Sequence, residues 1–204
     1  MRFGIVIFDD VEVLDAFGPF EVFSVATRLH TTRPGDNNLT VTLVSAYPDR
    51  LEVVARGGVR VIADVTIANA PAFDVLLVPG GVTTKVERDP AMMAWLADRA
   101  STPIIASVCT GAFLLAEAGI LTSQTVTSHW EDQAALAARY PQLTVVDGPR
   151  WVQQGRIYTS AGTSAGLDLA LHLLSAIDPN LPARVARQMD YEWHPGRQSD
   201  RLAE

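Results

Sequence analysis

Cysteine is almost absent from the sequence, because Cys109 is the only one among 204 residues. A single cysteine excludes an internal disulfide, which fits a reducing compartment, and we therefore expect a cytoplasmic protein. No apolar run reaches the 18 residues of a membrane-spanning helix, and the first apolar run, residues 3–8, is too short for a signal peptide. We expect no membrane partner.

Positive charge is also scarce, with 16 Lys and Arg against 23 Asp and Glu, a net charge of −7. The basic residues do not cluster, so we do not expect nucleic acid as a partner. We expect a small-molecule substrate instead. The Gly-Lys-Ser/Thr of a phosphate loop is missing, and we predict neither a cofactor nor a metal. Because 48% of the residues are hydrophobic and no linker interrupts them, we expect one domain over residues 1–204.

The most informative stretch surrounds Cys109. Residues 104–108 form a short apolar run typical of a buried parallel strand, and a helical pattern follows it. A cysteine between strand and helix, with the small residues Ser107 and Gly111 nearby, has the layout of a nucleophile elbow. Helix-start N–H groups favour the thiolate, so we predict that Cys109 is a nucleophile. The alternative is a small buried hydrophobic residue.

Backbone N–H groups at three turns are predicted to bind the ligand or to stabilise negative charge on a reacting atom. Each turn is rich in small residues and lies where a predicted strand ends or a helix begins. A plain tight turn is the alternative for the strand-end glycines. The candidates are Thr110 and Gly111, Gly80 and Gly81, and Gly162 and Thr163.

Two acids in the first third of the chain are candidates for proton transfer. We expect a helix that begins with Gly18 as its cap and Pro19 in its first turn, which leaves Asp15 in the preceding loop. Apolar neighbours would raise the pKa of Asp15 and let it carry a proton. The alternative is an acid that satisfies backbone N–H groups in a turn. Glu21, in the first helical turn, is open to the same two interpretations.

Histidines and aromatic residues give weaker signals. His129 follows a predicted strand over 125–128, where it either adjusts the thiol or serves as a structural hydrogen-bonding group. His172 lies among leucines and is expected in the core. Tyr191, Trp193 and His194 either flank a pocket or dock on the domain or on a partner subunit.

Strands alternate with helices along the chain, which predicts an α/β fold with a mostly parallel sheet covered on both faces. The expected strands after the first are 39–45, 75–78, 104–108, 125–128, 151–154 and 157–160, with a hairpin over 52–62. Further helices are expected over 90–99, 131–140 and 182–189.

Five separated motifs resemble the ThiJ/PfpI family of the class I glutamine amidotransferase-like superfamily. They are LDAFGPFEVF, DVLLVPGG, IIASVCTGAFLLAEAGIL, VTSHW and TSAGLDLALHLL. The resemblance implies a flavodoxin-like three-layer sandwich and a homodimer. Within the family, the motifs look most similar to isocyanide hydratases and to the sensor half of AraC-type regulators. The helix-turn-helix half of such regulators is not expected here, since no basic helical pair follows.

The hydratase resemblance implies that Cys109 attacks an isocyanide carbon while Asp15 moves the proton, giving an N-substituted formamide. It places the Thr110 hydroxyl beside the site and assigns ligand polarisation to amides near Gly81 and Thr110. Two features depart from known patterns: Thr110 replaces the histidine of protease-like members, and the loop Ser160–Thr163 differs from that of the hydratase. A ligand or cysteine-oxidation sensor, and an amidase, protease or glyoxalase-like enzyme, are the alternatives.

Overall fold

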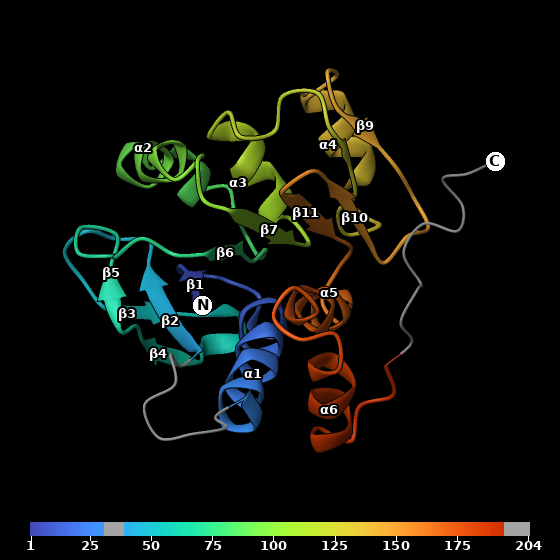
Figure 1. The fold of residues 1–204 in the computed structure, drawn as a ribbon. Coiled ribbons are helices and arrows are strands. Elements are labelled where there is room, and N and C mark those ends of the chain that lie inside the picture. Colours follow the sequence, from blue (N-terminus) through green and yellow to red (C-terminus); the bar gives the residue numbers. More distant parts are fainter. Residues whose placement is uncertain (31–38, 194–204) are drawn as a thin grey trace.

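The computed structural model describes residues 1–30 and 39–193, so His194 lies outside the described residues. A seven-stranded sheet forms the centre of the molecule, in the order β10-β11-β7-β6-β1-β2-β5 (Figure 1). The strands in chain order are β1 (Arg2–Ile7), β2 (Thr40–Ser45), β5 (Val65–Thr66), β6 (Val75–Val78), β7 (Ile104–Val108), β10 (Trp151–Gln154) and β11 (Ile157–Ser160). All neighbouring pairs are parallel except the edge pair β10–β11.

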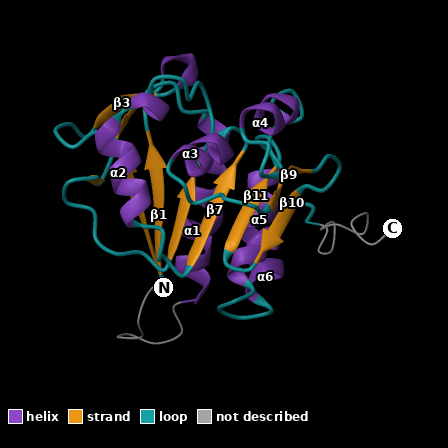
Figure 2. Cartoon of the chain, turned by 90° about the horizontal axis from the view of Figure 1, so that it is seen from above, coloured by secondary structure: helices purple, strands orange, loops and turns teal. Residues whose placement is uncertain are grey.

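The central strands are apolar because both faces of the sheet are covered. All four residues of β6 are buried, as are the last four of β7. Helices α1 (Val13–His30), α5 (Ala165–Leu174) and α6 (Leu181–Gln188) pack together on one face, and α2 (Pro90–Asp98) and α3 (Gly111–Glu117) cover the other (Figure 2). The predicted three-layer α/β sandwich is confirmed.

Smaller elements surround this core. The predicted hairpin consists of β3 (Glu52–Val54) and β4 (Arg60–Ile62), joined by a 3-10 turn over Arg56–Gly58. A second 3-10 turn, Val86–Arg88, precedes α2. The predicted strand over 125–128 is shorter than expected, because only β8 (Thr125–Val126) pairs, with β9 (Thr144–Val145). Helix α4 (Gln133–Arg139) lies between them.

The first helix corrects the sequence prediction. It begins at Val13, so Gly18 and Pro19 lie inside the helix and Asp15 lies in its first turn, not in a loop. Proline lacks an N–H group, so the helical hydrogen bond to the carbonyl of Asp15 four residues earlier is lost. Gly18 has a packing role: a Cβ atom there would lie 3.3 Å from Leu167 of α5.

Parallel strands bring their carboxyl ends to one edge of the sheet, where ligands bind in α/β folds. The connection after β1 leads to α1 on one face, whereas the connection after β6 leads to α2 on the other face. The two loops diverge between β1 and β6, next to the end of β7. Cys109 follows β7 directly, so the fold places it beside this switch point.

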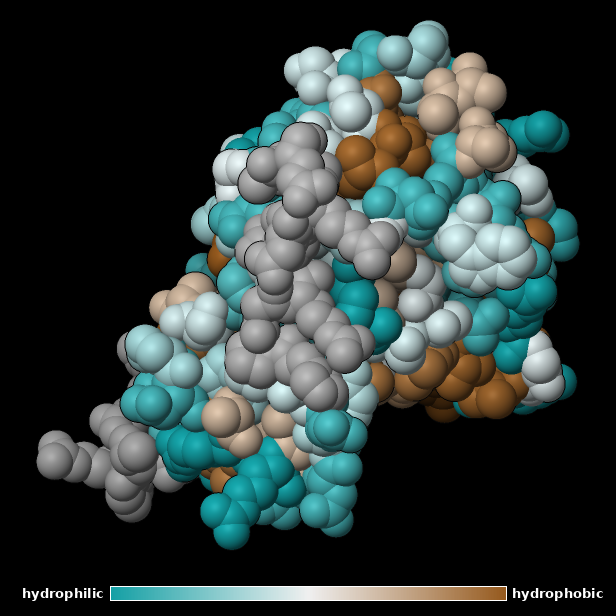
Figure 3. All heavy atoms as spheres, turned by 90° about the vertical axis from the view of Figure 1, so that its right-hand side faces the viewer, coloured by the Kyte–Doolittle hydropathy of each residue, from teal (hydrophilic) through white to brown (hydrophobic). Residues whose placement is uncertain are grey.

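The surface on the side of α4 and β9 is largely hydrophilic. On the part of this face that is not drawn in grey, apolar residues gather only in small, separate areas (Figure 3). None of the helices within residues 1–30 and 39–193 combines the length and apolar composition needed to cross a bilayer.

Candidate active site

Cys109 occupies a strained turn between β7 and α3. Its φ angle is 56°, a left-handed conformation that non-glycine residues adopt rarely and that is typical of a nucleophile elbow. Two hydrogen bonds fix the turn: the Cys109 N–H donates to the carbonyl of Ser160 (3.1 Å), and the Ser128 hydroxyl donates to the carbonyl of Cys109 (2.9 Å). Gly111 is required because a Cβ atom there would lie 2.1 Å from the carbonyl oxygen of Val78.

Asp15 lies behind the cysteine, fully buried. Its Oδ2 accepts a hydrogen bond from the Gly80 N–H (3.1 Å), while Oδ1 accepts none within the described part of the chain. Burial raises the pKa of Asp15 to about 7, although the Gly80 N–H, the Cys109 side chain and the Thr163 N–H each act to lower it. A carboxyl group with this pKa exchanges its proton readily near neutral pH.

The cysteine does not have the favoured thiolate that the sequence predicted. Burial, followed by the negative charge of Asp15, raises the pKa of Cys109 to about 12. The backbone N–H and the side chain of Thr110 act to lower this pKa but do not compensate. Cys109 is therefore a neutral thiol at rest, because desolvation outweighs the effect of the helix-start N–H group.

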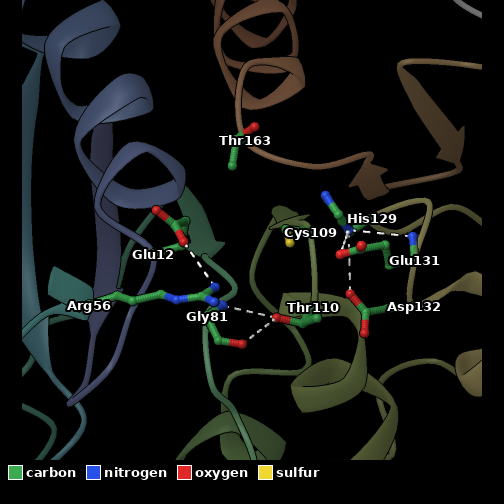
Figure 4. Close-up of a pocket in the computed structure, with 9 residues that line it drawn as sticks. All are labelled: Glu12, Arg56, Gly81, Cys109, Thr110, His129, Glu131, Asp132 and Thr163. Carbon is green, nitrogen blue, oxygen red and sulfur yellow. Dashed lines mark hydrogen bonds and ion pairs between the residues drawn. The ribbon is translucent and has the colours of Figure 1, made fainter.

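The sulfur faces a cavity of about 240 Å³ at the carboxyl edge of the sheet (Figure 4). Glu12 and Arg56 lie on one side of Cys109, and His129, Glu131 and Asp132 lie on the other. The remaining lining residues are Gly81, Thr110 and Thr163. Asp15 is not among the residues that line this cavity.

Two of the predicted amide donors already have partners. The Gly80 N–H donates to Asp15, and the Gly81 N–H donates to the Thr110 hydroxyl (2.9 Å), which in turn donates to the Gly81 carbonyl (3.0 Å). Gly80 and Gly81 therefore position the acid and Thr110, and the N–H beside the sulfur is that of Thr110. A Cβ atom on Gly80 would lie 2.6 Å from Thr110 N and 2.9 Å from Asp15 Oδ2, which explains the glycine.

The other predicted ligand-binding pair lies next to the cavity. Thr163 lines it with a left-handed backbone (φ 38°), whereas Gly162 supports His129 from behind. A Cβ atom on Gly162 would lie 2.0 Å from the His129 ring. His129 Nδ1 accepts a hydrogen bond from the Glu131 N–H (3.4 Å) and lies 3.5 Å from Asp132 Oδ2 and 3.7 Å from Glu131 Oε2.

Some predicted residues are not brought to the cavity. Glu21 lies inside α1, is exposed and pairs with Arg28 (3.3 Å), so the structure does not support the acid role. The Tyr191 hydroxyl donates to Asp168 (3.0 Å), and Trp193 packs on the core. Of the two alternatives predicted for these aromatic residues, the contacts favour docking on the domain over flanking a pocket. His172 is half-buried and stacks on Trp151, with ring centroids 4.0 Å apart.

Four residues that line the cavity were not predicted from the sequence, namely Glu12, Arg56, Glu131 and Asp132. The spacing of Asp132 three residues after His129 was a usable signal. Nothing in the sequence places Arg56 there, because it belongs to a hairpin turn whose position depends on tertiary packing. Across residues 1–30 and 39–193, no group of three or more His, Cys, Asp or Glu side chains is arranged to hold a metal ion.

Comparisons with known proteins agree with this architecture. The model of the DJ-1/PfpI family matches residues 1–176. Isonitrile hydratase of Pseudomonas putida is 29% identical over 176 residues, which cover 85% of this chain and 70% of that protein. The crystal structure of a ThiJ/PfpI family protein from Pseudomonas syringae has a TM-score of 0.80 at 26% identity, covering 96% of this chain and 76% of that chain.

A regulator is similar as well. The HTH-type transcriptional regulator CdhR of Pseudomonas aeruginosa is 35% identical over 145 residues, which cover 67% of this chain and 41% of the regulator. The chain thus spans about two-fifths of the length of that regulator. Because the family model covers most of the sequence, the chain belongs to the DJ-1/PfpI family.

Proposed function

We propose that the protein is a cysteine-dependent hydratase that converts isocyanides, or closely related small electrophiles, into N-substituted formamides. The observation that carries the proposal is the buried pair of Cys109 and Asp15, in which a neutral thiol faces the cavity and a carboxyl group with a pKa near 7 lies behind it. The similarity to isonitrile hydratase supports the same assignment.

The first step forms a carbon–sulfur bond. The carboxylate of Asp15 takes the proton of the Cys109 thiol as the sulfur attacks the terminal carbon of the isocyanide, and that carbon then receives the proton. The product is a thioimidate in which the former isocyanide carbon carries one hydrogen. A carboxyl group with a pKa near the working pH is suited to accepting and returning a proton within one step.

The second step adds water. Water attacks the thioimidate carbon, its proton moves to the nitrogen, and the tetrahedral adduct loses the sulfur to give an N-substituted formamide and the restored thiol. The atoms balance as one isocyanide plus one water, without a redox change. The Thr110 N–H group beside the sulfur would stabilise the departing thiolate.

Ligand binding without turnover is the second candidate, because the regulator CdhR is similar over two-thirds of this chain. Sensing by cysteine oxidation is less compatible with the site, since oxidation needs thiolate and burial raises the pKa of Cys109 to about 12. A hydrolase that uses a Cys-His pair is also less compatible, because the groups that shift the pKa of Cys109 are Asp15, Thr110 and Asp132, and His129 is not among them.

Formamide production from a panel of alkyl and aryl isocyanides tests the proposal. We expect turnover in the wild type, a loss of about 10³-fold or more in Cys109→Ala, and wild-type rates in the control Asp98→Asn, which changes an exposed acid on α2. Saturable binding of isocyanides without formamide would instead support the ligand-binding candidate. Formamide production that persists in Cys109→Ala would exclude the mechanism.

A further inference from the structure

The cavity in front of Cys109 has an unequal balance of charge. Its lining includes three carboxylates, Glu12, Glu131 and Asp132, and one guanidinium, Arg56. Arg56 Nη1 is already paired with Glu12 Oε2 at 3.2 Å (Figure 4). Three negative charges and one positive leave −2 when His129 is neutral, or −1 when it is protonated. The cavity is therefore negative in either state.

This charge acts on the reacting groups themselves. The carboxylate of Asp132 contributes to the raised pKa of Cys109, and that of Glu12 contributes to the raised pKa of Asp15. Fields in a cleft with low-dielectric walls are focused and act on entering ligands as well as on resident groups. A ligand at the sulfur thus experiences the same negative potential.

The arginines of the two neighbouring cavities do not offset it. Arg139 pairs with Glu87 and Glu117, and Arg150 pairs with Asp168. Beside His129, Trp130 is 71% exposed and lines one of these cavities, and the centroids of the two rings are 5.7 Å apart. The face of an exposed indole attracts cations.

We infer that Glu131 and Asp132 are specificity-determining residues that admit neutral and, above all, cationic electrophiles to Cys109 and exclude those bearing a carboxylate, sulfonate or phosphate. The inference rests on the proposed function only in taking this cavity as the substrate site. It deepens that function by naming the substrate class, namely isocyanides with a neutral or positively charged substituent.

Because Cys109 is the only cysteine, its modification can be followed by intact mass without interference. The probes are three methanethiosulfonates of similar size, one with a trimethylammonium group, one with a sulfonate and one uncharged. Each rate is divided by that of the same reagent with a small free thiol, which removes intrinsic reactivity. We expect the order cationic, neutral, anionic, with a normalised cation-to-anion ratio of about 10 or more at low salt.

The variant Glu131→Gln/Asp132→Asn tests which residues are responsible. The Asp132 side chain makes no capping hydrogen bond to α4, so the exchange leaves the helix start intact. We expect the ratio to fall at least about fivefold, towards unity. The control Asp49→Asn/Asp98→Asn removes the same charge from two exposed positions outside the cavity and should leave the ratio unchanged.

A wild-type ratio near unity, or a ratio that the cavity double variant leaves unchanged, would overturn the inference, as would failure of all three reagents to label Cys109. Labelling needs no turnover, so the outcome is separate from that for the hydratase. If the labelling order holds but no isocyanide is hydrated, charge selection stands and the proposed reaction fails. If hydration occurs without a preference for cationic over anionic isocyanides, the reaction stands and the inference fails.

Discussion

Asp15 and Glu87, two of the buried carboxyl groups, have very different surroundings. Asp15 is fully buried, and its contacts are backbone N–H groups and a thiol. Glu87, only 7% exposed, accepts a hydrogen bond from the Thr83 hydroxyl and pairs with the guanidinium of Arg139. Glu87 is thus a buried carboxyl group with a cationic partner, whereas no cation is among the groups that act on Asp15.

The presence or absence of a cationic partner distinguishes a carboxyl group with a structural role from one suited to proton transfer. A guanidinium supplies the counter-charge that a buried carboxylate needs, and the Glu87–Arg139 pair holds the turn before α2 against α4. Asp15 lacks a counter-charge, and burial raises its pKa into the neutral range. A buried acid without a cation, next to a nucleophile, is therefore the better candidate for proton transfer.

The largest effect expected from this comparison concerns activity. Asp15→Asn removes the proton carrier and should lower kcat/KM for isocyanide hydration by about 10² to 10⁴-fold. Glu87→Gln should change it by less than about threefold, because Glu87 does not line the Cys109 cavity. Steady-state formamide production measures both. Equal losses in the two variants would remove the distinction between them.

The free energy of unfolding should fall more in Glu87→Gln than in Asp15→Asn, the reverse of the order expected for activity. Glu87→Gln leaves Arg139 with only Glu117 as its anionic partner, and since Arg139 is 43% exposed, we expect a loss of about 1 to 3 kcal/mol. Asp15→Asn should not destabilise the protein at pH 8, because it replaces a buried charge with a neutral isostere. Urea unfolding of both variants checks this. A less stable Asp15→Asn at pH 8 would contradict it.

The pH dependence of stability should reveal the same difference. The folded-state pKa of Asp15, about 7, lies above its ordinary value of 3.8, so its contribution is present in full below pH 4 and is lost as pH rises through 7. Between pH 5 and pH 8, the wild type should lose about 2 to 3 kcal/mol relative to Asp15→Asn. Paired unfolding curves at the two pH values measure it, and parallel behaviour would refute the raised pKa.

His129 gives the smallest expected effect. Its Nδ1 accepts a hydrogen bond from the Glu131 N–H and its ring packs on Gly162. Since His129 is not among the groups that shift the pKa of Cys109, we expect it to shape the cavity without taking part in proton transfer. His129→Gln should reduce kcat by less than about tenfold, with most of the change in KM. A loss as large as that of Asp15→Asn would instead favour the Cys-His hydrolase interpretation.

Much of the fold was predictable because its signals are local. The apolar runs that became β6 and β7 and the small residues around Cys109 each identify an element without knowledge of its neighbours. The start of α1 was misplaced because Gly18 and Pro19 are common at helix starts, whereas here Gly18 serves helix packing.

The electrostatics of the site could not be predicted in the same way. A cysteine at a helix start predicts a thiolate only if it remains solvated, and its burial depends on Asp15 and on loops distant in sequence. Likewise, the glycine amides at the end of β6 looked like ligand donors, but their partners, Asp15 and Thr110, come from two other parts of the chain. Tertiary contacts, not sequence spacing, decide both.

The central claim is that Cys109 bonds covalently to the isocyanide carbon. Intact-mass analysis after acid quench of a single turnover tests it directly. The account predicts a transient adduct on the wild type heavier by the mass of one isocyanide, absent from Cys109→Ala and formed at least about a hundredfold more slowly in Asp15→Asn. Formamide released with no adduct at any time, or an adduct that survives in Cys109→Ala, would contradict it.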